Sequence, residues 1–184
     1  RWPNKVEHSL SLMQSVAVNK ALDLEKDIFS VNGPPGTGKT TLLKEIIANL
    51  IYKRAELLSN YHDPRDIFES IGQVKLSNYS FNVQKIDDSL KKFSIVIASS
   101  NNGAVENITK ELPRFNNISE EFVNEDDYFT KTSDRVLGEK TWGLLSAAFG
   151  NSSNINSFFN DFWFDDGTEG SNLRDYLKAE YEVS

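Results

Sequence analysis

The stretch "VNGPPGTGKTT" (31–41) decides the fold, because it fits the phosphate-binding pattern G-x-x-x-x-G-K-[ST]. Its glycines allow backbone N–H groups to converge on a polyphosphate. Lys39 is placed to reach the β- and γ-phosphates, and the Thr40 hydroxyl to coordinate Mg²⁺. We therefore predict a site for ATP and Mg²⁺, with Lys39 and Thr40 as catalytic residues and Thr40 as the metal ligand. The predicted nucleotide-binding residues of this loop are Gly33, Pro34, Pro35, Gly36, Thr37, Gly38, Lys39, Thr40 and Thr41.

The residues on both sides of this loop predict a strand–loop–helix unit. The run "DIFSVN" (27–32) is typical of a buried parallel strand. From residue 40 to 58, apolar residues recur at three- and four-residue spacing, which predicts an amphipathic helix. A further helix is expected over 9–22, and a second buried strand over 92–100 ("KFSIVIASS"). The predicted fold class is α/β: a P-loop NTPase whose parallel sheet is flanked by helices.

A second strand-to-helix turn follows residue 100. The sequence "NNGAVENITKEL" (101–112) predicts a helix that Ser100 or Asn102 could cap. In an open α/β sheet, ligands bind at the carboxyl ends of the strands. We therefore expect this turn to face the same side of the sheet as the phosphate-binding loop.

Composition limits the function classes. The chain has 184 residues, a net charge of −7 and no cysteine. The acidic balance argues against a broad basic face for nucleic acid, but it does not exclude local contacts. The absence of cysteine and of a charged-then-apolar leader predicts a reducing cytoplasm, and no run is long enough to span a membrane. His8 and His62 are isolated, so we predict no histidine metal site.

The chain reads as one domain over 1–184 with helical insertions. The segment 59–92 is long and polar for a connection between a helix and the next strand, so part of it is expected to protrude. Residues 118–184 are also expected to be peripheral. Within them, 142–164 suggests a pair of helices with aromatic residues at helical spacing, for which core packing is preferred over base stacking. These aromatic residues are Phe158, Phe159, Phe162 and Trp163.

Three motifs in this order, "QSVAV" (14–18), "GPPGTGKT" (33–40) and "SNNGAVENI" (100–108), resemble superfamily 1 helicases of the Upf-like group. The resemblance implies that the chain is the front part of the first RecA-like motor domain. It implies that Gln14 recognises adenine, which an amide can do in bidentate fashion. It also implies that the loop after the second strand contacts single-stranded RNA or DNA, with Glu106 where the family has Asp. The implied nucleic-acid-binding residues are Ser99, Ser100, Asn101 and Asn102.

The resemblance fades after residue 112, although 142–164 is similar to an insertion in bacterial relatives. A helicase of this kind needs a buried strand ending in Asp-Glu, and the nearest candidate is Asp165 with Asp166 after "FWF". The second RecA-like domain with its arginine fingers is not encoded, and the first residue, Arg1, is not Met. We therefore expect a piece of a larger polypeptide that binds ATP but neither hydrolyses it at a useful rate nor unwinds a duplex alone.

Two other function classes stay open. The loop "GPPGTGKT" also occurs in AAA+ ATPases, although these need neither the upstream glutamine nor the N-x-A-V turn. The missing acidic motif would instead suit a non-catalytic nucleotide-binding or interaction module. The paired motifs favour the helicase-like ATPase over both.

Overall fold

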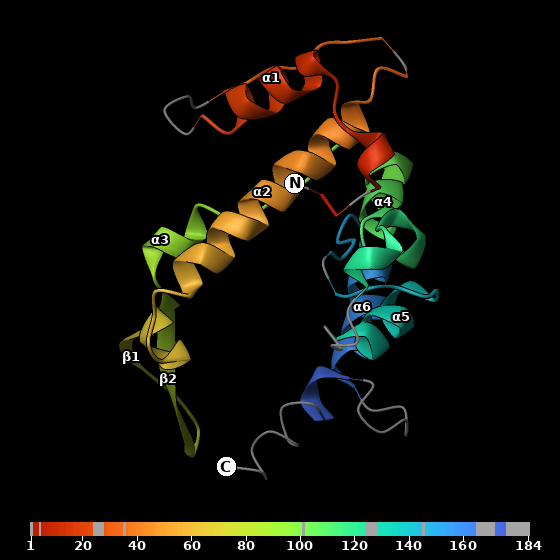
Figure 1. Cartoon of the computed structure of the whole chain (residues 1–184). Coiled ribbons are helices and arrows are strands. Elements are labelled where there is room, and N and C mark those ends of the chain that lie inside the picture. Colours follow the sequence, from red (N-terminus) through yellow and green to blue (C-terminus); the bar gives the residue numbers. More distant parts are fainter. Residues whose placement is uncertain are drawn as a thin grey trace. The chain divides into compact units, whose positions relative to one another are not determined.

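The computed structural model describes residues 2–3, 5–23, 28–34, 36–100, 102–123, 129–144, 146–164 and 172–175. The chain divides into two compact units (Figure 1). The first consists of Arg1–Trp2 and Leu10–Val96, and the second of Pro3–Ser9 and Ile97–Ser184. The phosphate-binding loop therefore belongs to the first unit, and the turn after residue 100 belongs to the second.

The first unit is built on the long helix α2 (Lys39–Leu58), against which α1 (Leu12–Ala21) packs. Both helices lie where apolar periodicity predicts them. The short helix α3 (Asp88–Lys91) also belongs to this unit, and its Leu90 is fully buried. The buried apolar side chains of this unit are Trp2, Val18, Leu42, Ile47, Leu90 and Phe93. The Glu45 carboxylate on α2 is buried with them and accepts a 3.1 Å hydrogen bond from the backbone N–H of Trp2.

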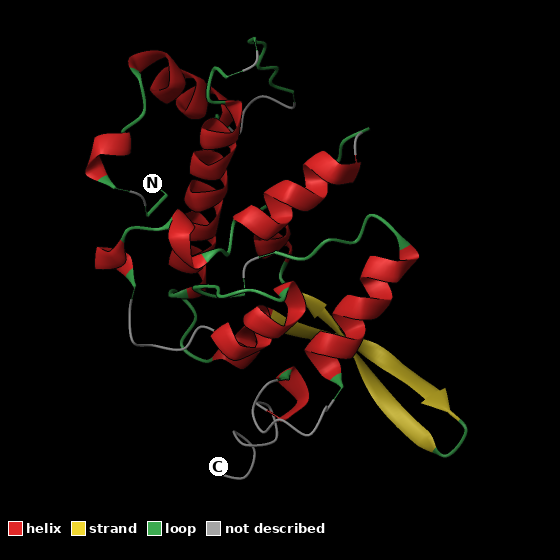
Figure 2. Cartoon of the chain, turned by 90° about the vertical axis from the view of Figure 1, so that its right-hand side faces the viewer, coloured by secondary structure: helices red, strands yellow, loops and turns green. Residues whose placement is uncertain are grey.

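A β-hairpin extends from the carboxyl-terminal end of α2 (Figure 2). After the 3-10 helix Pro64–Ile67, strand β1 (Phe68–Leu76) pairs antiparallel with β2 (Tyr79–Ile86). The backbone N–H of Asp87 donates to the carbonyl of Ile67 at 2.9 Å and closes the base of the hairpin. The expected protrusion within 59–92 is therefore a strand pair followed by α3.

The predicted parallel sheet is not confirmed. Among the described residues, the only sheet is this antiparallel pair. The segments 28–32 and 92–100, predicted as buried strands, form no strand, and Ile28 and Val96 are 88% and 91% exposed. A buried parallel strand requires hydrogen-bonded neighbours and helices over both faces. No described segment pairs with these two runs, so their apolar composition alone does not produce a strand.

The second unit is helical. It contains α4 (Asn102–Glu111), α5 (Thr130–Leu137) and α6 (Ser152–Trp163), with 3-10 helices at Val6–His8, Phe115–Asn117 and Glu120–Phe122. The helix predicted over 101–112 is thus present as α4, whereas the described residues of 142–164, all but 145, contain one helix, α6. No helix in the described part of the chain is long and apolar enough to cross a membrane.

Side-chain hydrogen bonds to the backbone hold the second unit together. The fully buried Ser133 hydroxyl donates to the carbonyl of Gly143 at 2.9 Å. The Asp134 carboxylate accepts from both the N–H and the hydroxyl of Thr141 at 2.6 Å. The Trp142 indole N–H donates to the carbonyl of Leu112 at 3.0 Å. These bonds satisfy polar groups in an interior with few large apolar residues.

The aromatic residues of α6 divide into two groups. The rings of Phe158 and Phe162 stack with centroids 4.8 Å apart, and Phe149 meets Phe158 edge-on at 5.0 Å. This is the packing that their spacing predicts. Phe159 and Trp163 are instead 57% and 39% exposed. Phe158 and Phe162 are themselves half-buried, so ring contacts form within part of the set but none of the four residues is in the buried core.

Candidate nucleotide-binding site

The phosphate-binding loop ends in an uncapped helix N-terminus. Gly36 and Gly38 have φ values of 81° and 77°, in the left-handed region that favours glycine. Gly38 is the N-cap residue of α2 and no side chain caps it. The first backbone bond of the helix runs from the Leu42 N–H to the Gly38 carbonyl at 3.0 Å. The N–H groups of the three preceding residues therefore lack an acceptor within the helix and can bind an anion.

The glycines are required for different reasons. A Cβ at Gly38 would lie 2.2 Å from the side-chain nitrogen of Gln14, and a Cβ at Gly33 would lie 2.8 Å from the Thr37 hydroxyl oxygen. At Gly36 a Cβ would meet nothing within 4 Å, so only its positive φ demands glycine. The loop thus packs closely around Gly38, at the point where the helix begins.

Lys39 folds back over its own loop. Its Nζ atom donates to the carbonyl of Gly33 at 2.7 Å and to that of Pro34 at 2.9 Å. The Thr37 hydroxyl donates to the same Pro34 carbonyl at 2.8 Å. The ammonium group is exposed, so a phosphate can reach it from solvent and replace neutral carbonyls with charge-assisted bonds.

A magnesium ion fits this loop through one protein ligand. The Thr40 side chain is exposed in the first turn of α2, and its hydroxyl is the oxygen donor that Mg²⁺ prefers. The described residues hold no cluster of three or more acidic or histidine side chains for a metal. Mg²⁺ commonly keeps several waters and binds through substrate phosphates, which matches a single hydroxyl. Pro35 lies outside the described residues, and Thr41 is half-buried in the first turn of α2.

Gln14 reaches the loop from α1. Its side-chain nitrogen is 3.5 Å from the Thr37 carbonyl, and its side-chain oxygen accepts the Ser11 N–H at 2.9 Å. The Ser11 hydroxyl in turn accepts the Gln14 N–H at 3.3 Å, which completes a capping box. The structure therefore brings the predicted adenine-reading amide to the loop, where protein groups engage both of its polar atoms. The oxygen keeps a second lone pair for a ligand.

Sequence reasoning missed Ser11. Its contacts orient the Gln14 amide, and the signal was present as S-x-x-Q at the start of an apolar periodic segment. That pattern predicts a capping box and hence a fixed glutamine side chain.

The predicted nucleic-acid-binding residues lie in the second unit. Ser99 and Ser100 are exposed in the segment that leads into α4. Asn101 lies outside the described residues; Asn102 is the first residue of α4, but its side chain lies outside them. Glu106, the residue that replaces the family's Asp, pairs with Lys110 one helical turn later at 2.7 Å. The candidate acids Asp165 and Asp166 also lie outside the described residues.

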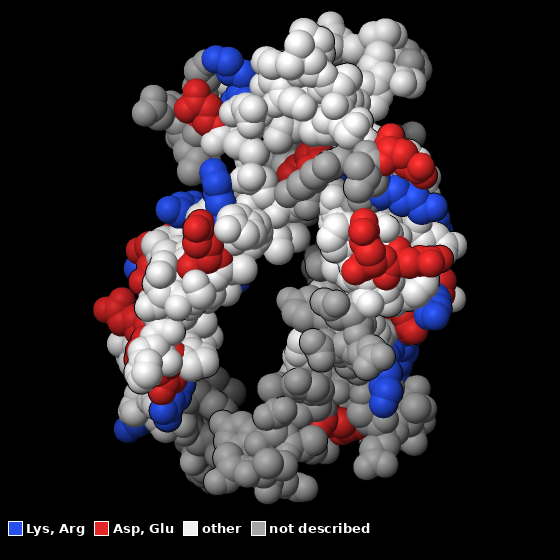
Figure 3. Space-filling model, in the orientation of Figure 1, with Lys and Arg blue, Asp and Glu red and all other residues white. Residues whose placement is uncertain are grey.

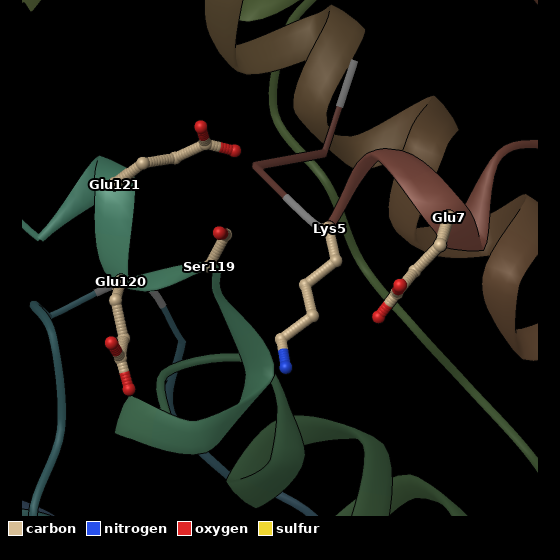
Figure 4. Close-up of a pocket in the computed structure, with 5 residues that line it drawn as sticks. All are labelled: Lys5, Glu7, Ser119, Glu120 and Glu121. Atoms are coloured by element: carbon tan, nitrogen blue, oxygen red, sulfur yellow. The ribbon is translucent and has the colours of Figure 1, made fainter.

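One pocket, of about 310 Å³, lies in the second unit between the N-terminal segment and the residues after Ile118 (Figure 4). It is lined by Lys5, Glu7, Ser119, Glu120 and Glu121. Three carboxylates against one ammonium would repel a polyphosphate. On the face shown in Figure 3, basic and acidic side chains occur in small interspersed groups. Binding of an anion is therefore expected from local geometry, as at the start of α2.

Comparison with known proteins gives two matches. The sequence profile of a family described as an AAA domain matches residues 9–129. The DNA polymerase alpha-associated DNA helicase A of Saccharomyces cerevisiae is 30% identical over 114 residues. That alignment covers 58% of this chain but 16% of the yeast protein, so the chain spans a small part of its curated relative. No solved structure matches the chain significantly.

Proposed function

Because this chain belongs to the AAA domain family, we propose that it is the ATP-binding portion of a helicase-like, nucleic-acid-dependent ATPase. The family match and the likeness to a yeast DNA helicase support a relationship to superfamily 1 helicases. Hydrolysis and unwinding are proposals for the larger protein, since the chain corresponds to 16% of that relative. The role proposed for this chain is to hold Mg·ATP.

The observation that carries the proposal is the start of α2. Gly38 ends the loop without a side-chain cap, so the first N–H groups of a 20-residue helix are available to phosphate. The Lys39 ammonium group lies at the same loop, where it donates to the Gly33 carbonyl at 2.7 Å. Binding of the β- and γ-phosphates would exchange the carbonyls for phosphate oxygens. The Thr40 hydroxyl would then complete the coordination of Mg²⁺ that arrives with the nucleotide.

Adenine recognition is proposed for Gln14. The Ser11 N–H bond fixes the orientation of its amide, and its nitrogen lies at the edge of the phosphate-binding loop. A fixed amide offers one donor and one acceptor, the pattern that the N6 and N7 edge of adenine complements. We therefore expect ATP to bind more tightly than GTP.

Contact with single-stranded nucleic acid is proposed for residues 99–102. Ser99 and Ser100 are exposed and directly precede the ten-residue helix α4. Hydroxyl groups and a helix N-terminus are both common donors to phosphate oxygens, and they carry no sequence preference. A few such contacts give weak, salt-sensitive binding in a chain of net charge −7.

Titration calorimetry with Mg·ATP tests the nucleotide site. Removing the Lys39 ammonium deletes a charge-assisted bond, which is worth about 1.5–3 kcal/mol, so Lys39→Ala should weaken binding by about 10- to 150-fold. Lys53→Ala is the matched control, because it removes a lysine from the same helix, away from the loop. Equal affinity of the Lys39 variant and the wild type would disprove the phosphate assignment.

A further inference from the structure

The hairpin β1–β2 has two chemically different faces. Its register pairs Val74 with Phe81 and Leu76 with Tyr79, which places these four apolar side chains on one face. The intervening pairs, Gln73 with Asn82 and Lys75 with Ser80, lie on the other face. We refer to the first as the aromatic face (Val74, Leu76, Tyr79 and Phe81) and to the second as the amide face.

The aromatic face is exposed to solvent. Val74 and Leu76 are 46% and 64% exposed, and Phe81 and Tyr79 are 57% and 72% exposed. A contiguous exposed apolar surface of this kind usually marks a site of interaction. The amide face has internal bonds instead: the Gln73 amide donates to the Asn82 side-chain oxygen at 2.8 Å. The polar face is thus satisfied within the hairpin, whereas the aromatic face is left for a partner.

We propose that the aromatic face of the β1–β2 hairpin is a stacking surface for single-stranded nucleic acid. The rings of Tyr79 and Phe81 lie with centroids 6.4 Å apart and planes inclined by 33°. Two neighbouring exposed rings of this kind can each take the face of a base, and stacking on aromatic side chains is a main source of sequence-tolerant binding to single strands. Val74 and Leu76 widen the apolar floor beside them.

Charge favours a nucleic acid over an apolar protein surface as the occupant. The hairpin contains Lys75 and Lys85 and one acid, Glu69, which pairs with Lys85 at its base. From Ser70 to the tip and back to Ile86 there is no Asp or Glu, although the whole chain carries a net charge of −7. Lys75 is near the tip, where a long flexible side chain can reach the phosphates of a strand stacked on the opposite face. Lys85 is at the base, 2.7 Å from Asp88. The tip of the hairpin therefore has no acidic side chain to repel phosphates, and its aromatic rings can stack on planar bases.

This inference rests on the proposed function for the presence of a nucleic-acid partner, but it concerns separate residues from 99–102 and from the nucleotide site. It gives the chain a contact for bases in addition to the proposed phosphate contacts. Binding should therefore depend on the bases as well as on charge.

Fluorescence anisotropy with a short labelled oligothymidylate tests the proposal. The double variant Tyr79→Ala/Phe81→Ala should bind at least about tenfold more weakly than the wild type. The variant Tyr79→Phe keeps the ring and should bind like the wild type. Tyr52→Ala is the matched control, because Tyr52 is a 64% exposed tyrosine on α2. Circular dichroism of each variant checks that the fold is retained.

An abasic oligonucleotide of the same length separates stacking from charge. The wild type should bind it about as weakly as the double variant binds oligothymidylate, and the double variant should show no further loss. Lys75→Gln should lower the salt dependence of oligothymidylate binding by about one unit of slope, with the preference for bases retained.

Three outcomes would overturn the inference. One is equal affinity of the double variant and the wild type for oligothymidylate, and another is no measurable binding by the wild type. The third is a dimer, seen by light scattering, that the double variant dissociates while oligothymidylate affinity stays unchanged; the face would then belong to a second copy. Calorimetry with Mg·ATP on the same samples distinguishes failure of this inference from failure of the nucleotide site.

Discussion

The binding regions proposed at the two ends of α2 differ in the groups that they present. At the amino end, Gly38 and Lys39 present backbone N–H groups and one ammonium to phosphate. At the carboxyl end, the hairpin presents the side chains of Tyr79 and Phe81. Binding of phosphate by backbone N–H groups requires particular residues at fixed spacing, so it can be recognised as a motif in the sequence. A binding surface on one face of two paired strands requires only that apolar and polar residues alternate and that the strands pair in the right register. Such a surface can be recognised once the strand pairing is known.

The largest expected effect is at the amino end, where Gly38→Ala is compared with Gly36→Ala. Placing an L-residue at the positive φ of Gly36 costs about 1–2 kcal/mol, so nucleotide affinity should fall by about 5- to 30-fold. Gly38→Ala carries the same cost and also places a Cβ 2.2 Å from the terminal nitrogen of the Gln14 side chain, which must move away, so its loss should be larger than that of Gly36→Ala. Calorimetry measures both. Equal losses would show that the close packing around Gly38 is unimportant for binding.

A smaller effect is expected for base selection by Gln14. Gln14→Ala should reduce the preference for ATP over GTP by about 1–2 kcal/mol, at the lower part of the range for bidentate amides, because protein groups already engage this amide. Competition of ATP and GTP against a fluorescent nucleotide gives the ratio. Asn19→Ala, on the exposed side of α1, serves as the control. If the ratio of ATP to GTP affinity does not change, Gln14 has a role in capping α1 and none in base selection.

At the carboxyl end of α2, the turn of the hairpin gives a more modest prediction. Ser77 has a φ of 51°, and Asn78 does not share the positive value, which is the arrangement of a type II′ turn with glycine preferred first. Ser77→Gly should stabilise the hairpin by about 0.5–1 kcal/mol. Hydrogen exchange of the β1 and β2 amides reports this. Asn78→Gly should have no such benefit, and an equal gain from both variants would contradict the assignment of the turn.

The smallest effect concerns pH at the base of the hairpin. Hydrogen bonds from Lys85 and Lys91 lower the pKa of Asp88 to about 2, from an ordinary value of 3.8. A carboxyl group with a lowered pKa in the folded chain stabilises the fold above its ordinary value, and this contribution is lost as the pH falls from about 4 towards 2. Because these groups are exposed, the change should be small. Amide chemical shifts of residues 85–91 should follow this titration. Asp88→Asn should remove the part that is due to Asp88 and leave the part due to Asp87, whose pKa is also lowered, by hydrogen bonds from Ser89 and Tyr61.

The sequence predicts α1, α2 and the glycine-rich loop between them because each depends on local pattern. Apolar residues at helical spacing place α1 and α2, and the glycine–lysine motif places the loop between them. The predicted strands at 27–32 and 92–100 depend on partners, which composition does not specify. In the described residues those partners are not found, and the two runs remain without strand structure.

The hairpin is predictable from the sequence, although the polar composition of 59–92 by itself indicates only an insertion. Val74, Leu76, Tyr79, Phe81 and Val83 alternate with polar residues around two turn residues, which is the pattern of a hairpin with one apolar face. What the pattern does not give is the bulge between Ser70 and Gly72, which changes the register toward the base. The contact between Gln14 and Thr37 also depends on tertiary structure, since 23 residues separate them.

The length of α2 has a practical consequence for experiments on this chain. A helix of 20 residues is about 30 Å long, so the glycine-rich loop at its amino end lies about 30 Å from Leu58, after which the chain leads to the hairpin. Because the chain has no cysteine, one cysteine introduced near each end can be spin-labelled without background. The distance between the labels, measured with and without nucleotide, would report whether α2 stays straight or bends when ATP binds.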